Sequence, residues 1–448
     1  MGYMSRRGRR PDESASKSAH SHVINDTEVQ AFLARCEVPP RDPEAGLSSD
    51  SLTCLRPVPA NPIRHIVAID GGFTEVDIDG NYPSASLAFF QFGVLVFGME
   101  DLEAIERQPF IDPKDMSKLR NIDRMKLVLP IRNIGLNGEA GLRHSIRRSL
   151  HDFLSKDRGG SNINDALAWL IFEGYRWPRM PSVWNLASCP HRACSARDIP
   201  LRSDEMRRDW TFRCLTCGET IFLADTLRLH EAIDEEIGAR GILGYITTAL
   251  EQIILAFVIK ALHDKRPRSL GEVLFVKDGP LAYFGQTANL FRPMRQLVGY
   301  LQEKANLYLV GLEKSGAFVE HADQIARHMK PGDILLLGND YIYRHILPGT
   351  PDAMDAYGRS TYYSVKLIFK AELGGVYVAT IPTAEAMIEP ERDKIANLDV
   401  VLHGVQKLRC DMYDSALLPV ALVNKLVSLA DHPSAAVLQA FAKRSLGT

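Results

Sequence analysis

Four of the seven cysteines fall in two closely spaced pairs. Cys189 and Cys194 have four residues between them, whereas Cys214 and Cys217 have two and are followed by a glycine that eases a turn. Zinc takes four soft ligands at the corners of a tetrahedron, and two cysteines in one short turn supply two corners. The second spacing is standard for such a turn, and the first lies at the edge of the usual range. The two pairs therefore predict a structural Zn²⁺ site of the zinc-ribbon type.

Other uses of these cysteines stay open, namely redox chemistry and unbound thiols. His191 and His230 are possible substitutes for one zinc ligand. Four cysteines would close the metal site, which is the arrangement of a structural and not a catalytic zinc. The cysteines outside the pairs are expected to be packing residues; they are Cys36, Cys54 and Cys410.

A second group of candidate residues consists of three carboxylates. Asp70 and Asp278 each end an apolar run and precede a glycine, in AIDGG and VKDGP. An acidic residue at the end of a buried strand lies at the edge of the sheet, and the glycine lets the chain turn away sharply. Glu251 is the acidic residue of the apolar helical stretch ITTALEQIILAFVIKAL, where a carboxylate needs a partner.

These carboxylates would repel one another unless a cation lay between them. Hard divalent ions such as Mg²⁺ or Mn²⁺ prefer oxygen ligands of this kind. Asp70, Glu251 and Asp278 together fit one such ion, or two about 4 Å apart, for the hydrolysis of a phosphodiester. A plain turn at each Asp-Gly is the alternative. Lys314, which follows a further strand, is either a phosphate contact or an ordinary exposed lysine.

Hydrophobic patterning predicts the elements that position these residues. Strands are expected at 64–70, 73–80, 84–97, 271–278 and 308–311, and a late hairpin at 362–371 and 376–381. Helices are expected at 111–129, 141–154, 243–262, 287–303 and 322–329, and over most of 417–446. The first three strands should form a meander, with a tight turn directly after Asp70. Strands first, followed by helices that alternate with strands, indicate an α/β fold with a mixed sheet flanked by helices.

Composition divides the chain into four parts. Residues 1–25 are expected to form a disordered basic tail, for which a non-specific nucleic-acid contact is the alternative role. Residues 161–235 hold all four tryptophans and both cysteine pairs, and are predicted to be an inserted zinc-ribbon subdomain. This insertion would split one larger domain into residues 26–160 and 236–448.

The overall composition excludes several classes of protein. The chain has 448 residues, 53 Lys and Arg against 55 Asp and Glu, and a hydrophobic fraction of 46%. This is enough for a sizeable core, and it excludes global disorder and a uniformly basic nucleic-acid coat. Positive charge for nucleic acid would have to be local, at sites such as 118–126, 143–148 and 202–213. No stretch has the pattern of a membrane span or a secretory signal, so a cytoplasmic location with reduced cysteines is expected.

The order of the motifs resembles the NurA nuclease family. AIDGG at Asp70 with the later YPSASLAFFQFG, the LEQ helix at Glu251, VKDGPL at Asp278, VGLEKS at Lys314 and the late strand YYSVKL occur in the family's order. The resemblance covers roughly residues 60–100 and 240–430, with both cysteine pairs in the gap. It implies a ribonuclease H-like fold and a metal-dependent DNA nuclease, in which the three carboxylates bind Mn²⁺ or Mg²⁺.

The resemblance also implies partners. NurA proteins form dimers and work with HerA, a hexameric DNA-translocating ATPase, in DNA end resection, and related bacterial pairs act in defence against phage. A homodimer and a HerA-like ATPase are therefore expected for this chain. Because the sequence contains no GxxxxGK[ST] motif, ATP-driven translocation would come from that partner.

One departure from the family concerns the end of the chain. The family often has a Tyr-Pro motif followed by an active-site histidine, whereas the matching stretch ALLPVALVN places Asn424 there. Asparagine does not titrate near neutral pH, and His403 is a distant substitute with no motif behind it. The predicted function is thus a divalent-metal-dependent DNA nuclease. The alternatives are a non-catalytic DNA-binding or assembly subunit, which Asn424 favours, and a zinc-ribbon DNA-binding protein with structural carboxylates.

Overall fold

The described part of the chain divides into two compact units. The computed structural model describes residues 22–36, 47, 51–78, 84–100, 122–178, 180–347, 349, 354–372, 374–408, 417–429 and 434–446. Residues 1–42 form the first unit and residues 43–448 the second. The first carries helix α2 (Thr27–Leu33), which begins where Asp26 accepts hydrogen bonds from two backbone N–H groups of the first turn. Most of the expected basic tail lies outside the described residues.

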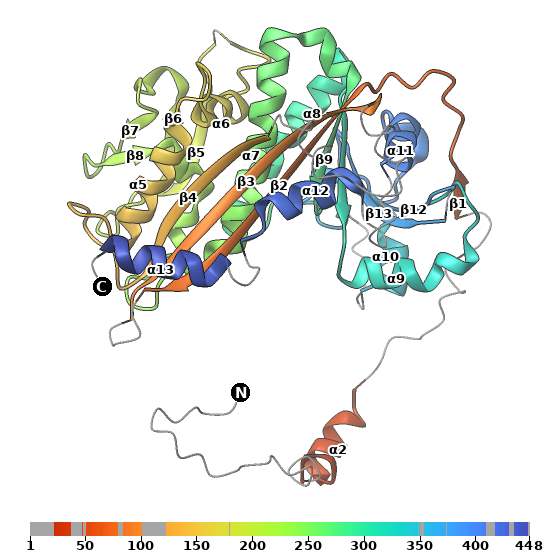
Figure 1. Ribbon diagram of the computed structural model, residues 1–448, viewed down its shortest axis with the longest axis horizontal. Coiled ribbons are helices and arrows are strands. Elements are labelled where there is room, and N and C mark those ends of the chain that lie inside the picture. Colours follow the sequence, from red (N-terminus) through yellow and green to blue (C-terminus); the bar gives the residue numbers. More distant parts are fainter. Residues whose placement is uncertain are drawn as a thin grey trace. The chain divides into compact units, whose positions relative to one another are not determined.

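Within the described residues, the second unit is built on a nine-stranded mixed sheet. Its strands are β1 (Leu52–Cys54), β2 (His65–Asp77), β3 (Ser86–Gly98), β4 (Ile122–Arg132), β9 (Val273–Asp278), β10 (Tyr308–Glu313), β11 (Asp333–Leu336), β12 (Ser364–Lys370) and β13 (Val376–Pro382). They lie in the order β1-β11-β12-β13-β10-β9-β2-β3-β4, as Figure 1 shows for its central part. β9 pairs in parallel with both β2 and β10, and the other neighbours pair in antiparallel fashion.

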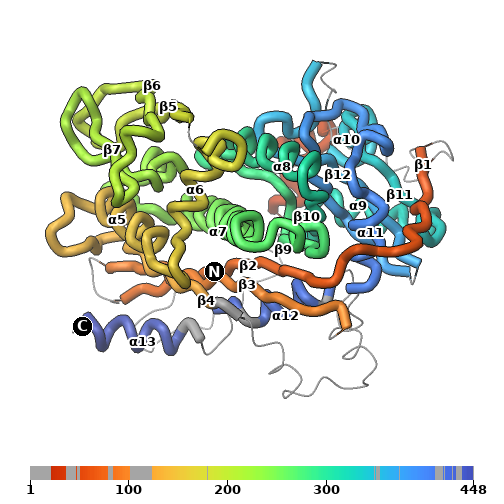
Figure 2. The backbone as a smooth tube through the Cα atoms, turned by 90° about the horizontal axis from the view of Figure 1, so that it is seen from above, coloured from red at the N-terminus to blue at the C-terminus, as the bar shows by residue number. Residues whose placement is uncertain are grey.

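Helices cover both faces of this sheet (Figure 2). One face carries α5 (Leu142–Ser155), α6 (Ile163–Ile171), α7 (Leu243–Lys265), α8 (Phe291–Ala305), α9 (Ala317–Ile325) and α10 (Asn339–His345). The other carries α11 (Leu398–Gln406), α12 (Leu418–Val427) and α13 (Ser434–Leu446). Successive side chains of a strand point to opposite faces of the sheet, so each strand contributes to the cores on both faces. Val67 and Ile69 of β2 pack in the core with α7, whereas Ala68 packs in the core with α11 and α12.

The apolar helix α7 lies at the centre of the larger core. Within the described chain, the segment 240–265 is long and apolar enough to cross a bilayer by length and composition alone. This segment includes α7. However, 67% of the apolar window is buried inside the protein. A buried core helix passes the same test, so this stretch is weak evidence for a membrane span.

Two expected elements near the candidate carboxylates differ from the structure. β2 does not end at Asp70 but continues through both glycines as one strand, paired with β3 over its whole length. The expected strands 64–70 and 73–80 are therefore one element, because the alternating residues after Gly72 keep the same pairing with β3. The predicted meander of 64–70, 73–80 and 84–97 is therefore wrong, because these segments form only β2 and β3; the third strand of the antiparallel meander is β4.

The second difference is the expected helix at 111–129. Residues 111–121 lie outside the described part, but 122–129 belong to strand β4. In this strand Met125, Leu127 and Leu129 are buried and alternate with exposed or charged residues. This period of two is the pattern of a strand. The many charged residues of the segment make the alternation hard to recognise in the sequence.

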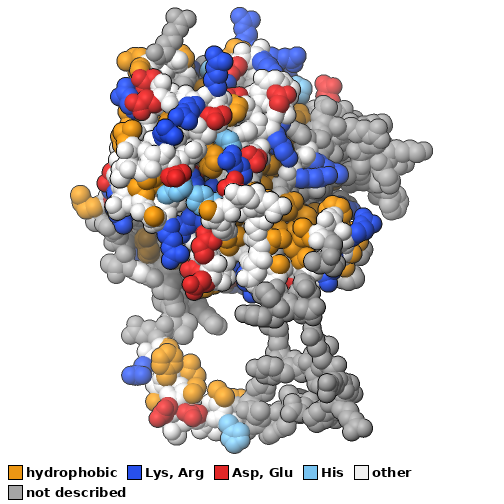
Figure 3. All heavy atoms as spheres, turned by 90° about the vertical axis from the view of Figure 1, so that its left-hand side faces the viewer, with side chains coloured by type: hydrophobic (Ala, Val, Ile, Leu, Met, Phe, Trp, Pro, Cys, Tyr) orange, Lys and Arg blue, Asp and Glu red, His pale blue; other side chains and the backbone are white. Residues whose placement is uncertain are grey.

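The cysteine-rich region forms two small hairpins that pack on the same core. They are β5 (Val183–Ser188) with β6 (Arg197–Arg202), and β7 (Thr211–Arg213) with β8 (Thr220–Phe222). Leu186, Phe212 and Ile221 share a buried cluster with residues of α5, α6 and α7. Acidic and basic side chains are interspersed on the face that includes this region (Figure 3). The domain boundaries at 161 and 235 stay a prediction.

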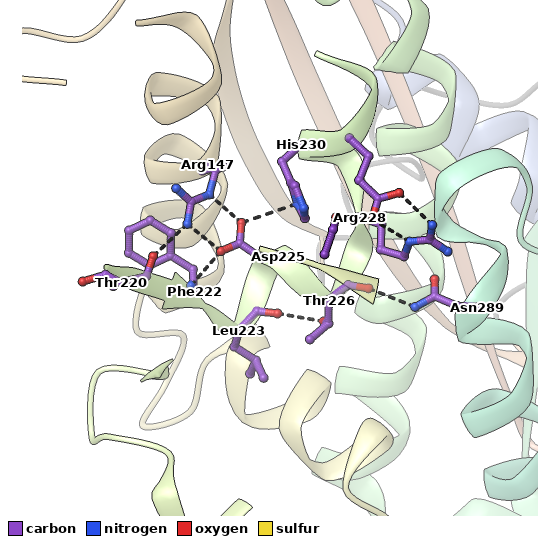
Figure 4. Close-up of polar contacts among 11 residues, drawn as sticks. Arg147, Thr220, Phe222, Leu223, Asp225, Thr226, Arg228, His230 and Asn289 are labelled. Carbon is purple, nitrogen blue, oxygen red and sulfur yellow. Dashed lines mark hydrogen bonds and ion pairs between the residues drawn. The ribbon is translucent and has the colours of Figure 1, made fainter. Parts of the chain in front are cut away.

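A buried ion pair ties this region to α5 (Figure 4). The Arg147 guanidinium donates to both carboxylate oxygens of Asp225, at 2.8 and 2.7 Å, and also to the carbonyl oxygen of Thr220. The backbone N–H of Phe222 donates to the same carboxylate, and His230 lies 3.8 Å from it. Because Arg147 is buried in this pair, it is not one of the local nucleic-acid contacts expected at 143–148.

Candidate metal centres

The four paired cysteines meet at one point. Cys189 follows β5, Cys214 follows β7, and the second cysteine of each pair lies in the loop of its hairpin. All four sulfur atoms lie within 4.8 Å of one another. The Cys189–Cys217 and Cys194–Cys214 distances are 3.8 and 3.9 Å. A tetrahedron with Zn–S bonds of about 2.3 Å has edges of ~3.8 Å, so these cysteines fit a structural zinc ion.

The backbone around the second pair supports thiolate ligands. Gly218 has a φ of +75°, which permits the tight turn after Cys217, and its N–H donates to the carbonyl of Cys214. Burial raises the pKa of Cys214, but hydrogen bonds from the backbone of Cys217 and Thr216 outweigh burial and lower this pKa to about 7. At Cys214 the lowered pKa favours the deprotonated sulfur that a metal requires, whereas burial raises the pKa of Cys189 in the same cluster.

The alternative ligands and the other cysteines take different positions. His191 lies beside His144 and 3.8 Å from Glu219, and His230 lies beside Asp225, so neither belongs to the four-ligand group. Cys36 and Cys54 are exposed free thiols, which corrects the expectation that they are packing residues. Cys410 lies outside the described residues.

Asp70 and Asp278 lie side by side on two parallel strands. Ile69 of β2 is in register with Lys277 of β9, so the next residue on each strand is an aspartate. β9 ends there, and Gly279 turns the chain away with a φ of +84°. Because β2 runs on without a partner on that side, the sheet opens at the two carboxylates. The two candidate aspartates therefore come from neighbouring strands of the sheet.

Glu251 reaches the same opening from helix α7. Its Oε1 accepts a hydrogen bond of 3.1 Å from the backbone N–H of Gly71, which also donates to Asp70 Oδ1 at 2.8 Å. A Cβ atom at Gly71 would lie 2.7 Å from the ring of Phe92 and 3.2 Å from Glu251 Oε1. The missing side chain of Gly71 therefore lets α7 bring its carboxylate to the strand.

Two lysines neutralise two of the three carboxylates. Lys277 is only 3% exposed and places its ammonium 2.9 Å from Glu251 Oε2. It also donates to the backbone carbonyl of Asp278. Lys314, which follows β10, donates to Asp278 Oδ2 at 2.6 Å and keeps 32% of its side chain exposed. Lys314 thus lies at the carboxylates, as one of its two predicted roles requires.

Asp70 is the carboxylate without a cation. It is 5% exposed, and among the described residues its Oδ2 atom has no hydrogen-bond partner. Burial and the charges of Asp278 and Glu251 raise the pKa of Asp70 from 3.8 to about 7, against the opposing effects of Lys314 and Gly71. Burial also raises the pKa of Glu251, although Lys277 opposes this. An unpaired carboxylate oxygen beside two other acidic groups fits a divalent cation.

The three carboxylates are not gathered as closely as the cysteines are. Over the described residues, the four cysteines are the one group of three or more His, Cys, Asp or Glu side chains placed to hold a metal. Asp70 and Asp278 continue the series Ala68 and Val276, whose side chains face the α12 layer, whereas Lys277 follows Phe275 toward α7. The Glu251–Lys277 pair therefore comes from the opposite face of the sheet to the two aspartates.

The two candidate substitutes for the family histidine lie elsewhere. Asn424 is exposed on α12, the helix that packs on β2 and β3. His403 on α11 places its Nε2 3.0 Å from the carbonyl oxygen of Arg56. Within the described part of the chain, neither residue hydrogen-bonds to any of the three carboxylates.

Sequence reasoning missed Lys277. The signal was present, because a lysine directly before Asp278 interrupts the otherwise apolar strand VLFV. A charged residue in a buried strand needs a charged partner, and Glu251 was the unpaired acidic group. The role of Gly71 was also missed, since the Gly-Gly pair was interpreted as a turn.

Comparisons with known proteins give little further identification. No protein-family model matches the chain, and no curated protein matches it at a significant level. Among solved structures, the chain is similar to the crystal structure of the NurA nuclease from Sulfolobus solfataricus. That match covers 96% of this chain and 98% of the other, with 6% sequence identity and a TM-score of 0.37. A similarity this loose carries no conclusion about the chemistry of the present chain.

Proposed function

We propose that this chain is a divalent-metal-dependent DNA nuclease whose metal is held by Asp70 and Asp278. The observation that supports it is the pair of carboxylates on adjacent parallel strands at the opening of the sheet, with Asp70 Oδ2 buried and unpaired. The proposal includes a ribonuclease H-like fold. It would consist of the antiparallel meander β2-β3-β4, of β9, which follows helix α7 and pairs in parallel with β2, and of β10 beside β9. Mn²⁺ and Mg²⁺ are the ions that such ligands suit.

The chain's own residues would prepare the site for a phosphodiester. A bound divalent ion would activate water and stabilise the leaving oxygen. The N–H of Gly71 fixes the orientation of the Asp70 carboxylate, and burial of Asp70 keeps bulk water away from it. Lys314 is long and partly exposed, so it can leave Asp278 and contact a phosphate of the substrate.

The choice of DNA and the partners come from the motif resemblance. The proposed partners are a second copy of this chain, in a homodimer, and a HerA-like hexameric ATPase that feeds DNA to the nuclease. The complex would act in DNA end processing or in defence against phage. A partner that holds the DNA agrees with the mixed charge of the face in Figure 3. The predicted zinc ion would hold the two hairpins together and take no part in cleavage.

A nuclease assay on linear DNA, with and without Mn²⁺ and a co-expressed ATPase, tests this proposal. Asp70→Asn and Asp278→Asn should each lower Mn²⁺-dependent cleavage by at least 100-fold, because each removes a ligand charge. Asp323→Asn, an exposed aspartate on α9, is the matched control and should cleave like the wild type. Normal cleavage by folded Asp70→Asn and Asp278→Asn protein would overturn the assignment.

A non-catalytic assembly subunit is the second candidate function. The observation that favours it is that Glu251 and Asp278 already have lysine partners, which would keep a silent site stable. Such a subunit would bind DNA and the ATPase without cutting. The same assay distinguishes the two, since a wild-type chain that binds DNA but shows no Mn²⁺-dependent cleavage with the ATPase present supports the second.

A further inference from the structure

We infer that the carboxylate centre takes one divalent cation and that the buried ammonium of Lys277 replaces a second one. This inference rests on the proposed nuclease function and gives that site its metal count. The sequence-based expectation left open one ion or two, bound by all three carboxylates; the present inference selects one ion and excludes Glu251 as a ligand.

The first step is that both carboxylate oxygens of Glu251 already have partners within the protein. Oε1 accepts from the Gly71 N–H at 3.1 Å, and Oε2 lies 2.9 Å from Lys277 Nζ. Both side chains of the ion pair are nearly buried, with 3% of Lys277 and 7% of Glu251 exposed. Separating such a pair would leave two buried charges without partners, which is strongly unfavourable. Glu251 is therefore held by the protein and not by a metal.

The second step is that Lys277 cannot leave its position easily. It is a β9 residue in register with Ile69 of β2 and Gly311 of β10, at the centre of the sheet. Its ammonium is also fixed by the carbonyl of Asp278. Lys314, in contrast, follows β10 and is about a third exposed, so its ion pair with Asp278 can open. The two lysines thus differ in kind: Lys277 is a permanent charge, and Lys314 is a replaceable one.

The third step is that one cation position is left. Asp70 Oδ2 is buried and unpaired among the described residues, and Asp278 becomes available when Lys314 moves. These two carboxylates lie on neighbouring strands, on the face of the sheet away from Lys277. One divalent ion on this pair, with Lys277 fixed behind it, balances the three negative charges.

Counting bound Mn²⁺ tests the inference without measuring cleavage. In zinc-loaded full-length protein, Mn²⁺ titration followed by electron paramagnetic resonance should give one ion per chain for the wild type. Glu251→Gln should still bind one, with a dissociation constant within about threefold of the wild type, whereas Asp70→Asn and Asp278→Asn should bind none. Two ions in the wild type, or loss of the ion in Glu251→Gln, would overturn the inference and leave the nuclease proposal standing. No Mn²⁺ in the wild type would overturn both.

A thermal double-mutant cycle keeps the test decisive if one variant is unstable. With saturating Mn²⁺, Lys277→Met should lower the melting temperature, and adding Glu251→Gln should recover most of that loss, because the pair persists when the metal is bound. If Glu251→Gln recovers nothing in the presence of Mn²⁺, the carboxylate has moved to the metal and the inference is wrong. The Lys314→Met variant is the control, since its effect should not depend on Glu251.

Discussion

Single titratable groups set how this protein responds to pH, and His321 on α9 is the best placed of them. It is buried, and its Nε2 lies 2.8 Å from the hydroxyl of Tyr341. Burial, and then the charge of His345, lowers the pKa of His321 from 6.5 to about 4. Between these values the unfolded chain binds a proton that the folded chain excludes. The contribution of His321 to the free energy of unfolding should therefore fall as the pH drops below 6.5 and level off near pH 4, whereas the raised pKa of Asp70 acts in the opposite direction.

Urea unfolding at pH 7.5 and pH 5 measures this effect. On going from pH 7.5 to pH 5, His321 should lower the free energy of unfolding of the wild type by roughly 2 kcal/mol relative to that of His321→Gln, because glutamine does not titrate. His65→Gln, at an exposed position, serves as the matched control and should keep the pH dependence of the wild type. The same pH dependence in His321→Gln as in the wild type would show that His321 makes no such contribution.

At the same scale, the sequence was informative about residue types and silent about ion pairing. An aspartate before a glycine at the end of an apolar run has a local meaning, so Asp70 and Asp278 could each be proposed as a ligand at the edge of the sheet. The Glu251–Lys277 pair joins a helix to a strand, and only the packing of α7 on β2 brings the two together. The sequence around each of these two residues does not indicate that the other is its partner.

Whole elements are locked together by buried charge, and the Arg147–Asp225 pair joins α5 to the hairpin region. Both side chains are nearly inaccessible, and Arg147 holds the pKa of Asp225 below its usual value although burial opposes this. Asp225→Asn should therefore lower the free energy of unfolding by about 3–5 kcal/mol, because Arg147 keeps a buried charge without its partner.

Chemical denaturation of matched variants checks this prediction. Glu139→Gln removes the partner of Arg148, another α5 residue, whose ion pair with Glu139 is more exposed, and should cost less than about 1 kcal/mol. Similar losses for Asp225→Asn and Glu139→Gln would mean that the buried pair contributes no more than a surface pair.

Elements were predicted well where one period dominates the sequence. The apolar run of α7 and the late hairpin β12–β13 have no competing interpretation. The charged outward positions of β4 predict a helix from the sequence alone, and Gly71 and Gly72 in isolation predict a turn that would divide β2 into two strands. Pairing with β3 on one side holds β2 extended through both glycines, and a single sequence does not display that pairing.

The whole molecule has two candidate metal centres that share one core, because the cluster around α7 extends from the hairpins to β2 and β9. Loss of the zinc ion should consequently destabilise the entire second unit and not only the hairpins. Cys214→Ser/Cys217→Ser should release about one zinc per chain, and should lower the melting temperature of a single cooperative transition by roughly 5 °C or more.

Metal analysis and calorimetry on the same sample test this coupling. Cys54→Ser removes an exposed thiol outside the cluster, so it should retain both the zinc and the wild-type melting temperature. Retained zinc in the double variant would place the ligands elsewhere. Zinc loss with an unchanged melting temperature would show that the hairpins fold independently of the sheet. The double variant should still bind Mn²⁺ when it is folded, because the ligands Asp70 and Asp278 come from β2 and β9 and not from the hairpins.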